Sequence, residues 1–481
     1  MPRRTKILAT LGPGSSDESN LTKLIQAGVN VFRLNFSHGS AEEHTERAVT
    51  IRKIAKSLQI PVGILCDMQG PKIRIGGFAN DAKIDLAVDD IFSLDSNMDK
   101  EAGNQDSVYI EQELLEDMDA GDKLLLDDGR LTFDILEKSS TVARCKVVQG
   151  GVLSSKKGVN KFGGGLSADA LTPKDKADIK TAAALKTDYL AISFVRAAAD
   201  VELTRQLLKD AGSSAHIIAK VERAEAITEE FLPGIIEASD GVMVARGDLG
   251  VEIGDANLVA VQKQLIEAAM SANKVVITAT QMMESMITAP TPTRAEVFDV
   301  ANAVLDGTDA VMLSAETAVG SYPVETVTAM ARVIEGAEKH PLTQRSKHRI
   351  DETFERIDES LALSAMYAAN HLKGVKAVIC MTETGFTPLL MSRITSSLPI
   401  YAFAEKAGTC EITALYKGVV PVPFETSSLK PSDINHLAVE KLREYNAVCD
   451  GDLVLITKGD FVNVQGGTNT LKIVRVGDII R

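Results

Sequence analysis

Two kinds of segment alternate along most of the chain, and each has its own pattern of hydrophobic and polar positions. Short runs of Val, Ile, Leu and Ala, as expected for strands covered on both faces, are separated by stretches with helical periodicity. Helix starts are marked between them by Thr172-Pro173 and by the capping-box pair Thr293 and Glu296. The apolar runs lie at residues 5–12, 29–37, 61–68, 188–194, 215–222, 240–246, 274–280 and 309–316.

This alternation predicts an α/β protein built on a parallel sheet, and eight β/α units favour a closed (β/α)8 TIM barrel over an open sheet. We assign residues 1–70 and 170–340 to the barrel. Residues 71–169 differ, with short alternating runs, Asp and Gly turns, and a hairpin pattern around Asp127-Asp128-Gly129-Arg130. They predict an inserted all-β domain at the active-site end of the barrel, where it would act as a lid.

The remaining residues, 341–481, predict a separate three-layer α/β domain. Its expected helices lie at 359–372 and 431–445, and its expected strands at 375–380, 399–404, 452–458 and 470–476.

Composition narrows the classes of function. A net charge of −14 argues against nucleic acids and anionic membranes as partners, because both require a basic surface. No apolar run approaches the ~18 residues of a membrane span, and residues 1–11 lack a secretory pattern, so we expect a cytoplasmic protein. The five cysteines are far apart and never spaced C-x-x-C, which favours reduced thiols over disulfides or a zinc site.

The run at 215–222 ends in Lys220 and Glu222, which lie two residues apart and therefore on one face of a strand. Buried Lys and Glu are rare unless they are paired or functional, so these two residues alone leave a structural ion pair and an active site equally open. The carboxyl ends of the other predicted strands are also polar, which favours a site at that mouth of the barrel. These ends carry Arg33, Asn35, Ser37, Asp67, Ser193, Arg246, Asp248, Thr280, Ser314 and Glu316.

The segment D-G-V-M-V-A-R-G-D-L-G-V, residues 240–251, leads a buried strand into Gly247 and Asp248. Glycine lets the backbone approach a ligand, and a helical turn beginning here would offer the amides of Gly247 and Asp248 to a carboxylate. Glu222 and Asp248, at the ends of neighbouring strands, supply two hard oxygen ligands of the kind that suits Mg²⁺. A zinc site would need His or Cys, and none is placed for it.

A third motif, R-L-N-F-S-H-G at residues 33–39, combines a guanidinium, an amide, a hydroxyl and an imidazole after a buried strand. This combination is suited to bind phosphate and a cation. The chain has no G-x-x-x-x-G-K-[ST] loop, so a nucleotide here would not be held by a Walker fold.

The runs R-L-N-F-S-H-G, I-A-K-V-E, M-V-A-R-G-D-L-G, T-A-T-Q-M-M-E-S-M and M-L-S-A-E-T-A, in this order, resemble those of the pyruvate kinase family. The resemblance extends over the whole chain. It implies transfer of the phosphoryl group of phosphoenolpyruvate to ADP, giving pyruvate and ATP in the last step of glycolysis. It also implies a homotetramer.

The resemblance assigns residue roles. Lys220, Arg33 and Thr280 would be catalytic and would bind substrate, together with the backbone of Gly247 and Asp248. Glu222 and Asp248 would hold Mg²⁺. The nucleotide side would comprise Asn35, Ser37, His38, Arg74 and Lys157.

One departure from the family pattern lies in D-M-Q-G-P-K-I-R, residues 67–74. Members that require K⁺ carry Glu where this chain has Lys72, and the ion rests among residues matching Asn35, Ser37, Asp67 and the carbonyl of Met68. An ammonium tethered on Lys72 can occupy that place, so we expect activity without K⁺.

The family places its activator, a sugar phosphate, in a turn that matches T-E-T-G-F-T, residues 382–387. Thr382, Thr384, Gly385 and Thr387 are therefore candidates for binding a sugar-phosphate or nucleotide effector, although an ordinary helix cap has a similar sequence. Gly459 and residues 465–467 would form the opposing loop.

Two alternatives remain open. A Mg²⁺-dependent enolpyruvate lyase or aldolase would share Glu222 and Asp248 but would not need Lys157 or residues 33–38. A catalytically silent metabolite sensor built on the C-terminal domain would tolerate the loss of Lys220.

Overall fold

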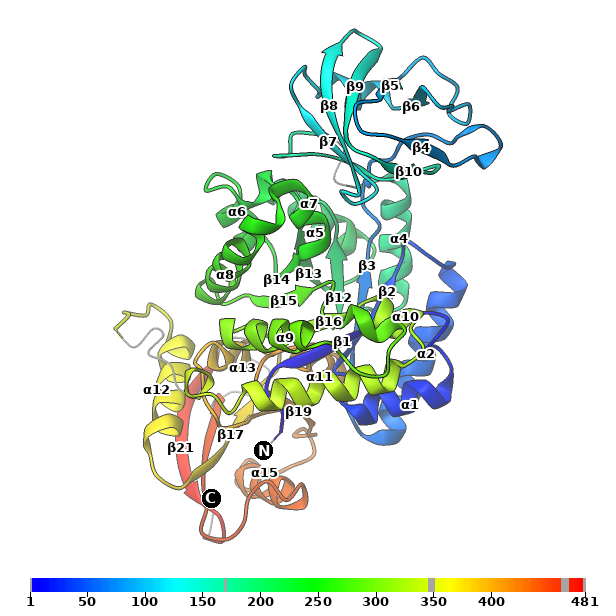
Figure 1. Cartoon of the computed structure of the whole chain (residues 1–481). Helices are drawn as coiled ribbons and strands as arrows, with labels where there is room; N and C mark the ends of the chain where they lie inside the picture. Colours follow the sequence, from blue (N-terminus) through cyan, green and yellow to red (C-terminus); the bar gives the residue numbers. More distant parts are fainter. Residues whose placement is uncertain (1, 168–170, 345–350, 460–466, 479–481) are drawn as a thin grey trace.

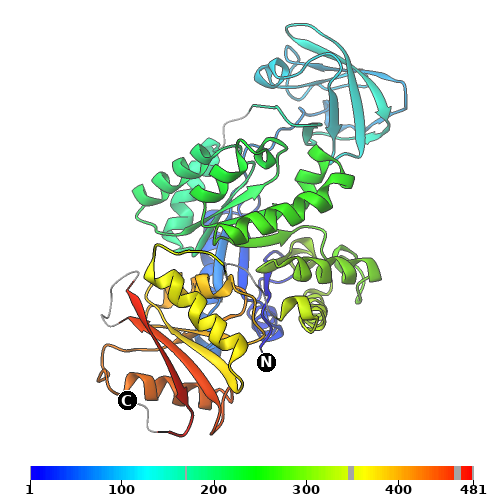
Figure 2. The same ribbon diagram turned by 90° about the vertical axis from the view of Figure 1, so that its left-hand side faces the viewer.

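The computed structural model describes residues 2–167, 171–344, 351–459 and 467–478. Three bodies follow one another along the molecule, with the barrel in the middle, the inserted β-domain at one end and the C-terminal domain at the other (Figures 1 and 2). No helix in these described ranges is long and apolar enough to cross a membrane.

The central body is a closed barrel of parallel strands, which confirms the predicted fold. Each strand lies inside one of the predicted apolar runs, and its interior positions are buried because helices cover the outer face. The order around the barrel is β1-β16-β15-β14-β13-β12-β3-β2. The strands are β1 (Lys6–Thr10), β2 (Val31–Asn35), β3 (Gly63–Asp67), β12 (Tyr189–Ile192), β13 (His216–Val221), β14 (Gly241–Ala245), β15 (Val275–Ala279) and β16 (Ala310–Leu313).

Helices connect these strands. The predicted starts at Thr172 and Thr293 are confirmed as capping boxes, in which each threonine accepts from the amide three residues on. The α-helices are α1 (Glu18–Ala27), α2 (Ala41–Leu58), α4 (Pro173–Ala184), α5 (Ala198–Asp210), α6 (Leu232–Ala238), α7 (Arg246–Ile253), α8 (Asp255–Ser271), α9 (Arg294–Asp306), α10 (Ala315–Ala318) and α11 (Pro323–Ala337). Short 3-10 turns lie at η2 (Glu225–Ile227), η3 (Glu284–Ile287) and η4 (Pro341–Thr343).

The inserted domain follows β3 and has its own hydrophobic core, in which the rings of Phe92 and Phe133 lie 5.7 Å apart. The predicted hairpin is confirmed, with Leu126 opposite Leu131 across the turn. A six-stranded sheet runs β11-β7-β8-β9-β5-β6 beside the pair β10-β4. The elements are η1 (Ala79–Asp81), β4 (Ile84–Leu86), β5 (Ile91–Asp95), β6 (Ser107–Tyr109), α3 (Gln112–Glu116), β7 (Lys123–Leu126), β8 (Leu131–Lys138), β9 (Val142–Gln149), β10 (Gly151–Leu153) and β11 (Val159–Lys161).

The C-terminal domain has a five-stranded sheet in the order β19-β18-β17-β20-β21, with separate hydrophobic clusters on its two faces. These clusters and the helices that contribute to them form the predicted three layers. The strand β19 and the helices α13 and α14 were not predicted. The elements are α12 (Ile357–His371), β17 (Val375–Met381), α13 (Phe386–Ser392), β18 (Ile400–Ala404), α14 (Ala407–Thr413), β19 (Val419–Pro423), α15 (Ile434–Glu444), β20 (Leu453–Gly459) and β21 (Thr468–Arg475).

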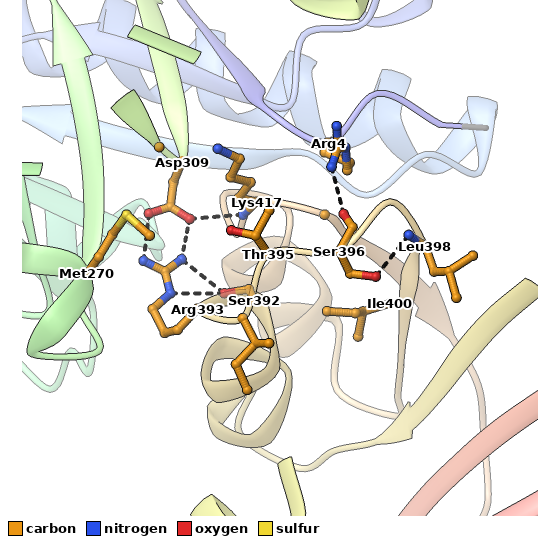
Figure 3. A pocket seen from close by; sticks show the side chains of 13 residues that line it. Arg4, Met270, Asp309, Ser392, Arg393, Thr395, Ser396, Leu398, Ile400 and Lys417 are labelled. Atoms are coloured by element: carbon orange, nitrogen blue, oxygen red, sulfur yellow. Dashed lines mark hydrogen bonds and ion pairs between the residues drawn. The ribbon is translucent and has the colours of Figure 1, made fainter. Parts of the chain in front are cut away.

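A buried ion pair joins the C-terminal domain to the amino end of the barrel (Figure 3). Arg393 follows α13 and Asp309 precedes β16, and their exposed fractions are 2% and 0%. Both terminal nitrogens of the guanidinium contact the carboxylate: Nη1 lies 2.9 Å from Oδ2, and Nη2 contacts Oδ1. The amides of Val276 and Lys417 also donate to Asp309, at 2.9 and 3.1 Å. One carboxylate therefore connects two barrel strands with two segments of the C-terminal domain.

Candidate active site

Arg33, Asp67 and Lys220 meet at the carboxyl ends of β2, β3 and β13. Asp67 is 1% exposed and accepts from Arg33 Nε at 2.6 Å, while its other oxygen lies 3.2 Å from Lys220 Nζ. Burial opposes ionisation of Asp67, but the two cations outweigh it and lower the pKa of the carboxyl. Asp67 therefore stays ionised and holds the side chains of Arg33 and Lys220 next to each other. The sequence analysis had placed both residues at one site.

The Lys220 ammonium is enclosed by acceptors. Besides Asp67, it lies 2.9 Å from Glu222 Oε1 and donates to the Ser193 hydroxyl at 2.7 Å. Ser193 in turn donates to the carbonyl of Met68 at 2.8 Å. Burial alone would lower the pKa of Lys220, but Asp67 and Glu222 raise it above its usual value. The side chain is therefore a fixed positive charge.

Glu222 lies beside Lys220, as the two-residue spacing predicted. Its second oxygen accepts from the amide of Phe194 at 2.7 Å. Burial raises the pKa of Glu222 to about 7, Lys220 opposes the rise, and the nearby charge of Asp248 adds to it. The Asp248 carboxylate contributes to the raised pKa of Glu222 by repulsion. A cation bound near the two carboxylates would therefore be stabilising.

Gly247 and Asp248 lie in the first turn of α7, which begins at Arg246 directly after β14, so the helical turn that the amide cradle requires is present. The Gly247 amide donates to Thr280 Oγ1 at 2.9 Å. Arg246, one of the polar strand-end residues, instead pairs with Asp299 at 2.7 Å and donates to the carbonyl of Thr280. Arg246 therefore supports the local structure behind the site.

Thr280 has a φ of 69°, in the left-handed region that a β-branched residue rarely adopts. Its hydroxyl donates to the carbonyl of Ala279 at 2.6 Å and accepts from Gly247. Strained backbone of this kind costs about 1–3 kcal/mol and persists where surrounding contacts hold it, commonly at functional sites. Thr280 and Gly247 are thus fixed against each other at the mouth of the barrel.

Lys72 lies elsewhere than the sequence suggested. Its ammonium contacts Asp248 at 3.1 Å and Asp128, on the hairpin of the inserted domain, at 3.2 Å. We expected it among Asn35, Ser37, Asp67 and Met68, and its contacts within the described residues are with the two acids instead. Burial opposes protonation, but both acids raise the pKa of Lys72, so the side chain stays charged.

The five residues expected on the nucleotide side fall into two groups. Asn35 ends β2 on the barrel, and Ser37 and His38 follow it; the Asn35 side chain accepts from the Ser37 amide at 3.1 Å. Arg74 and Lys157 lie on the connections to the inserted domain. Arg74 donates to the carbonyl of Lys156 at 3.0 Å, and Lys157 pairs with Asp127 at 2.7 Å.

A cleft of about 600 Å³ separates the hairpin of the inserted domain from α7. Its barrel side includes Gly247, Gly250 and Gln281, and its other side includes Asp128 and Phe162. This volume is in the range of small-ligand sites. The inserted domain therefore faces the barrel mouth, in keeping with a lid.

The residues present fit Mg²⁺ better than a metal that needs a full protein cage. No group of three or more His, Cys, Asp or Glu residues in the described ranges is arranged to hold an ion. Glu222 and Asp248 offer two carboxylates, and Mg²⁺ commonly takes one or two carboxylates and completes its shell with water and substrate oxygens.

Three contributors to the site were missed from the sequence. Thr10 accepts from Arg33 Nη1 at 3.1 Å, Asp128 binds Lys72, and Glu252 on α7 contacts the inserted domain. Thr10 ends β1 and lies within the predicted run 5–12, so its hydroxyl could have been placed near the mouth. Asp128 and Glu252 carry no comparable signal.

The candidate effector turn precedes α13. Gly385 has a φ of 84° and donates its amide to Thr382 Oγ1 at 2.9 Å. The Thr387 hydroxyl is buried against Thr468 Oγ1 at 2.9 Å, on the opposing strand β21. Of the expected opposing loop, Gly459 ends β20, while residues 465 and 466 lie outside the described ranges.

Comparison with known proteins identifies the family. A family model described as pyruvate kinase, barrel domain, matches residues 2–327, and one described as pyruvate kinase, alpha/beta domain, matches residues 359–474. The chain is 56% identical to pyruvate kinase II of Salmonella typhimurium over 476 residues, 98% of this chain and 99% of that protein. It is 54% identical to the pyruvate kinase of Haemophilus influenzae over 470 residues, 97% of each chain. The chain therefore belongs to the pyruvate kinase family of phosphotransferases.

Proposed function

We propose that the cluster of Arg33, Asp67, Lys220, Glu222 and Asp248 is where this chain transfers the phosphoryl group of phosphoenolpyruvate to ADP. The observation that carries the proposal is the Lys220 ammonium, fixed 2.9 Å from Glu222 and 3.2 Å from Asp67 in a buried setting. Phosphoryl transfer requires positioning and neutralisation of charge, and preorganised cations provide both.

Each residue has a distinct part in the reaction. Arg33 and Lys220 neutralise the charge on the phosphoryl group and on the enolate that it leaves. Amides at the start of α7, at Gly247 and Asp248, receive the substrate carboxylate, since N–H groups at a helix start attract anions. The Gly247 amide would exchange its bond to Thr280 Oγ1 for one to the substrate. Thr280 orients the proton that converts the enolate to pyruvate, because its hydroxyl is held beside Gly247.

Glu222 and Asp248 would hold the Mg²⁺ ion. When bound, the ion neutralises negative charge and orients phosphoryl and enol oxygens. The raised pKa of Glu222, caused by burial and by Asp248, supports this assignment because both effects are relieved by a cation.

The test is whether pyruvate formation from phosphoenolpyruvate depends on ADP. We expect one ATP for each pyruvate, with no pyruvate formed when ADP is omitted. A lyase or aldolase on the same barrel would release pyruvate without making ATP, and a metabolite sensor would form none. Either result would contradict the proposal.

We infer that the enzyme works without K⁺. Lys72 supplies a permanent ammonium beside Asp248, although it binds this acid and Asp128 and not the residues that hold K⁺ in the family. Activity in a potassium-free tetramethylammonium buffer should therefore be close to that in K⁺. Lys72→Met should lose activity in tetramethylammonium and regain part of it in K⁺. A parent enzyme with only a small fraction of its activity in tetramethylammonium would refute the inference.

A phosphorylated effector, a sugar phosphate or a nucleotide, is expected at the turn of Thr382, Thr384, Gly385 and Thr387. Thr384→Val should raise the effector concentration needed for half-maximal activation by about tenfold. This change corresponds to the loss of one hydrogen bond to a charged group. The measurement is the KM for phosphoenolpyruvate across an effector titration. Crystals soaked in sugar phosphates and nucleoside monophosphates that leave this turn empty would exclude the site.

We expect a cytoplasmic homotetramer. Large apolar side chains are exposed on two separated faces: Val259 and Phe298, on α8 and α9, are 59% and 74% exposed, and Ile357 and Tyr367 are exposed on α12. Two self-complementary faces are what a tetramer of paired dimers requires. Phe298→Glu should yield dimers in sedimentation velocity, and a monomeric parent protein would contradict the expectation.

A further inference from the structure

The helix α7 contacts the inserted domain at both of its turns. Its first turn carries Asp248, whose carboxylate binds Lys72 on the outgoing connection. Its second turn carries Glu252, four residues later and hence on the same face of the helix. Glu252 lies beside the return connection, which includes β11. The helix α7 thus carries the amides proposed to bind the substrate carboxylate in its first turn and contacts the lid through its second turn.

Glu252 is 4% exposed, and its contacts span the two domains. One carboxylate oxygen accepts from Asn160 Nδ2, on β11, at 3.2 Å. The other accepts from the amide of Ala224, which follows Glu222 on the barrel, at 2.8 Å. The backbone carbonyl of Glu252 accepts from the Gly163 amide at 2.9 Å. A single residue therefore ties the lid to α7 and to the segment after β13.

Neighbouring contacts hold the same connection. Arg223, also buried, donates to the carbonyl of Leu166, and Glu225 accepts from the Gly165 amide at 2.5 Å. These contacts fix the return connection against the barrel from Asn160 to Leu166. At the tip of the lid hairpin, Asp128 and Arg130 are exposed, and the tip pairs with residues of the two connections, Asp128 with Lys72 and Asp127 with Lys157. Orientation of the lid is therefore set where the return connection is attached to the barrel.

We propose that Glu252 is a positioning residue that sets the orientation of the lid over the active site. The inference rests on the proposed function, because its consequence concerns Arg74 and Lys157, the two nucleotide-side residues carried by the connections to the lid. Phosphoenolpyruvate is instead bound by barrel residues, Arg33, Lys220 and Gly247. A misplaced lid therefore affects ADP more than phosphoenolpyruvate.

The test is a swap of partners across the domain boundary. Asn160→Asp places a second carboxylate against Glu252, which removes their hydrogen bond and adds repulsion. We expect the KM for ADP to rise by about tenfold or more, since small misplacements of binding groups are costly, with the KM for phosphoenolpyruvate within about twofold. Adding Glu252→Gln restores a donor that faces the introduced carboxylate, and the double variant should recover the KM for ADP to within about threefold of the parent.

The matched control is Asn104→Asp, an exposed position on the lid far from Glu252 in sequence and partners, where the side-chain oxygen accepts from the amides of Asp106 and Ser107. It should leave both KM values unchanged. Failure of the swap to restore ADP binding, or equal rises in both KM values, would overturn the positioning role. A parent enzyme that makes no ATP from phosphoenolpyruvate and ADP would instead refute the proposed function, so the two failures are distinguishable.

Discussion

Replacing Lys220 with methionine is expected to lower turnover by about 10²- to 10³-fold, the effect of removing one preorganised donor from a developing negative charge. The ammonium lies within 3.2 Å of Asp67, Glu222 and Ser193, so its position is fixed before substrate arrives. Methionine has a similar length and no charge. The KM for phosphoenolpyruvate should change less than kcat, because the largest charge develops in the transition state.

This experiment needs a control for folding, since methionine leaves Asp67 and Glu222 without their shared cation. Circular dichroism and thermal unfolding of the variant report on the fold. Lys53→Met, on the exposed surface pair with Glu18, is the matched control and should turn over normally. A folded Lys220→Met variant with near-normal turnover would refute the catalytic role.

Arg393→Met is expected to destabilise the protein by about 3–5 kcal/mol, because it leaves a buried carboxylate without its cation. Asp309 is 0% exposed and would keep the amide donors of Val276 and Lys417, together with the attraction of the Lys6 and Lys417 ammonium groups. The double variant Arg393→Met, Asp309→Asn removes the charge from both sides and should recover part of the loss.

Urea unfolding should show this loss in the transition that separates the C-terminal domain from the barrel, because the pair joins them. Multidomain chains unfold in more than one step, so each transition is fitted separately. An Arg393→Met variant with all transition midpoints unchanged would contradict this account of the interface. Recovery in the double variant distinguishes the ion pair from simple loss of packing.

The barrel could be predicted because its strands are continuous apolar runs, a pattern that buried parallel strands impose on their sequences. The strand β19 was missed because it contains Pro421 and Pro423, which argue against a strand. The structure shows why it forms: β19 is an edge strand, where proline is tolerated. Helices α13 and α14 were missed because seven residues give little periodicity.

The candidate site could be located because strand ends of a barrel converge at one mouth. Spacing alone placed Lys220 beside Glu222, and polar strand ends brought Arg33 and Asp67 to the same place. Lys72 was misplaced because its long side chain reaches Asp128, whose location depends on how the lid packs on the barrel. Glu252 gave no signal, since an acid within a short helix is most often exposed, and only the fold reveals its contact with Asn160.

In the proposed reaction, Glu222 and Asp248 hold one divalent ion, and Lys220 contacts the substrate beside it. The most direct measurement is a crystal structure with Mn²⁺, used as an anomalous scatterer in place of Mg²⁺, and a non-reactive phosphoenolpyruvate analogue. We expect one anomalous peak at about 2.1 Å from carboxylate oxygens of both Glu222 and Asp248, with the analogue in contact with Lys220. A metal bound away from either carboxylate, or an analogue held in a cavity that Lys220 does not reach, would contradict the account.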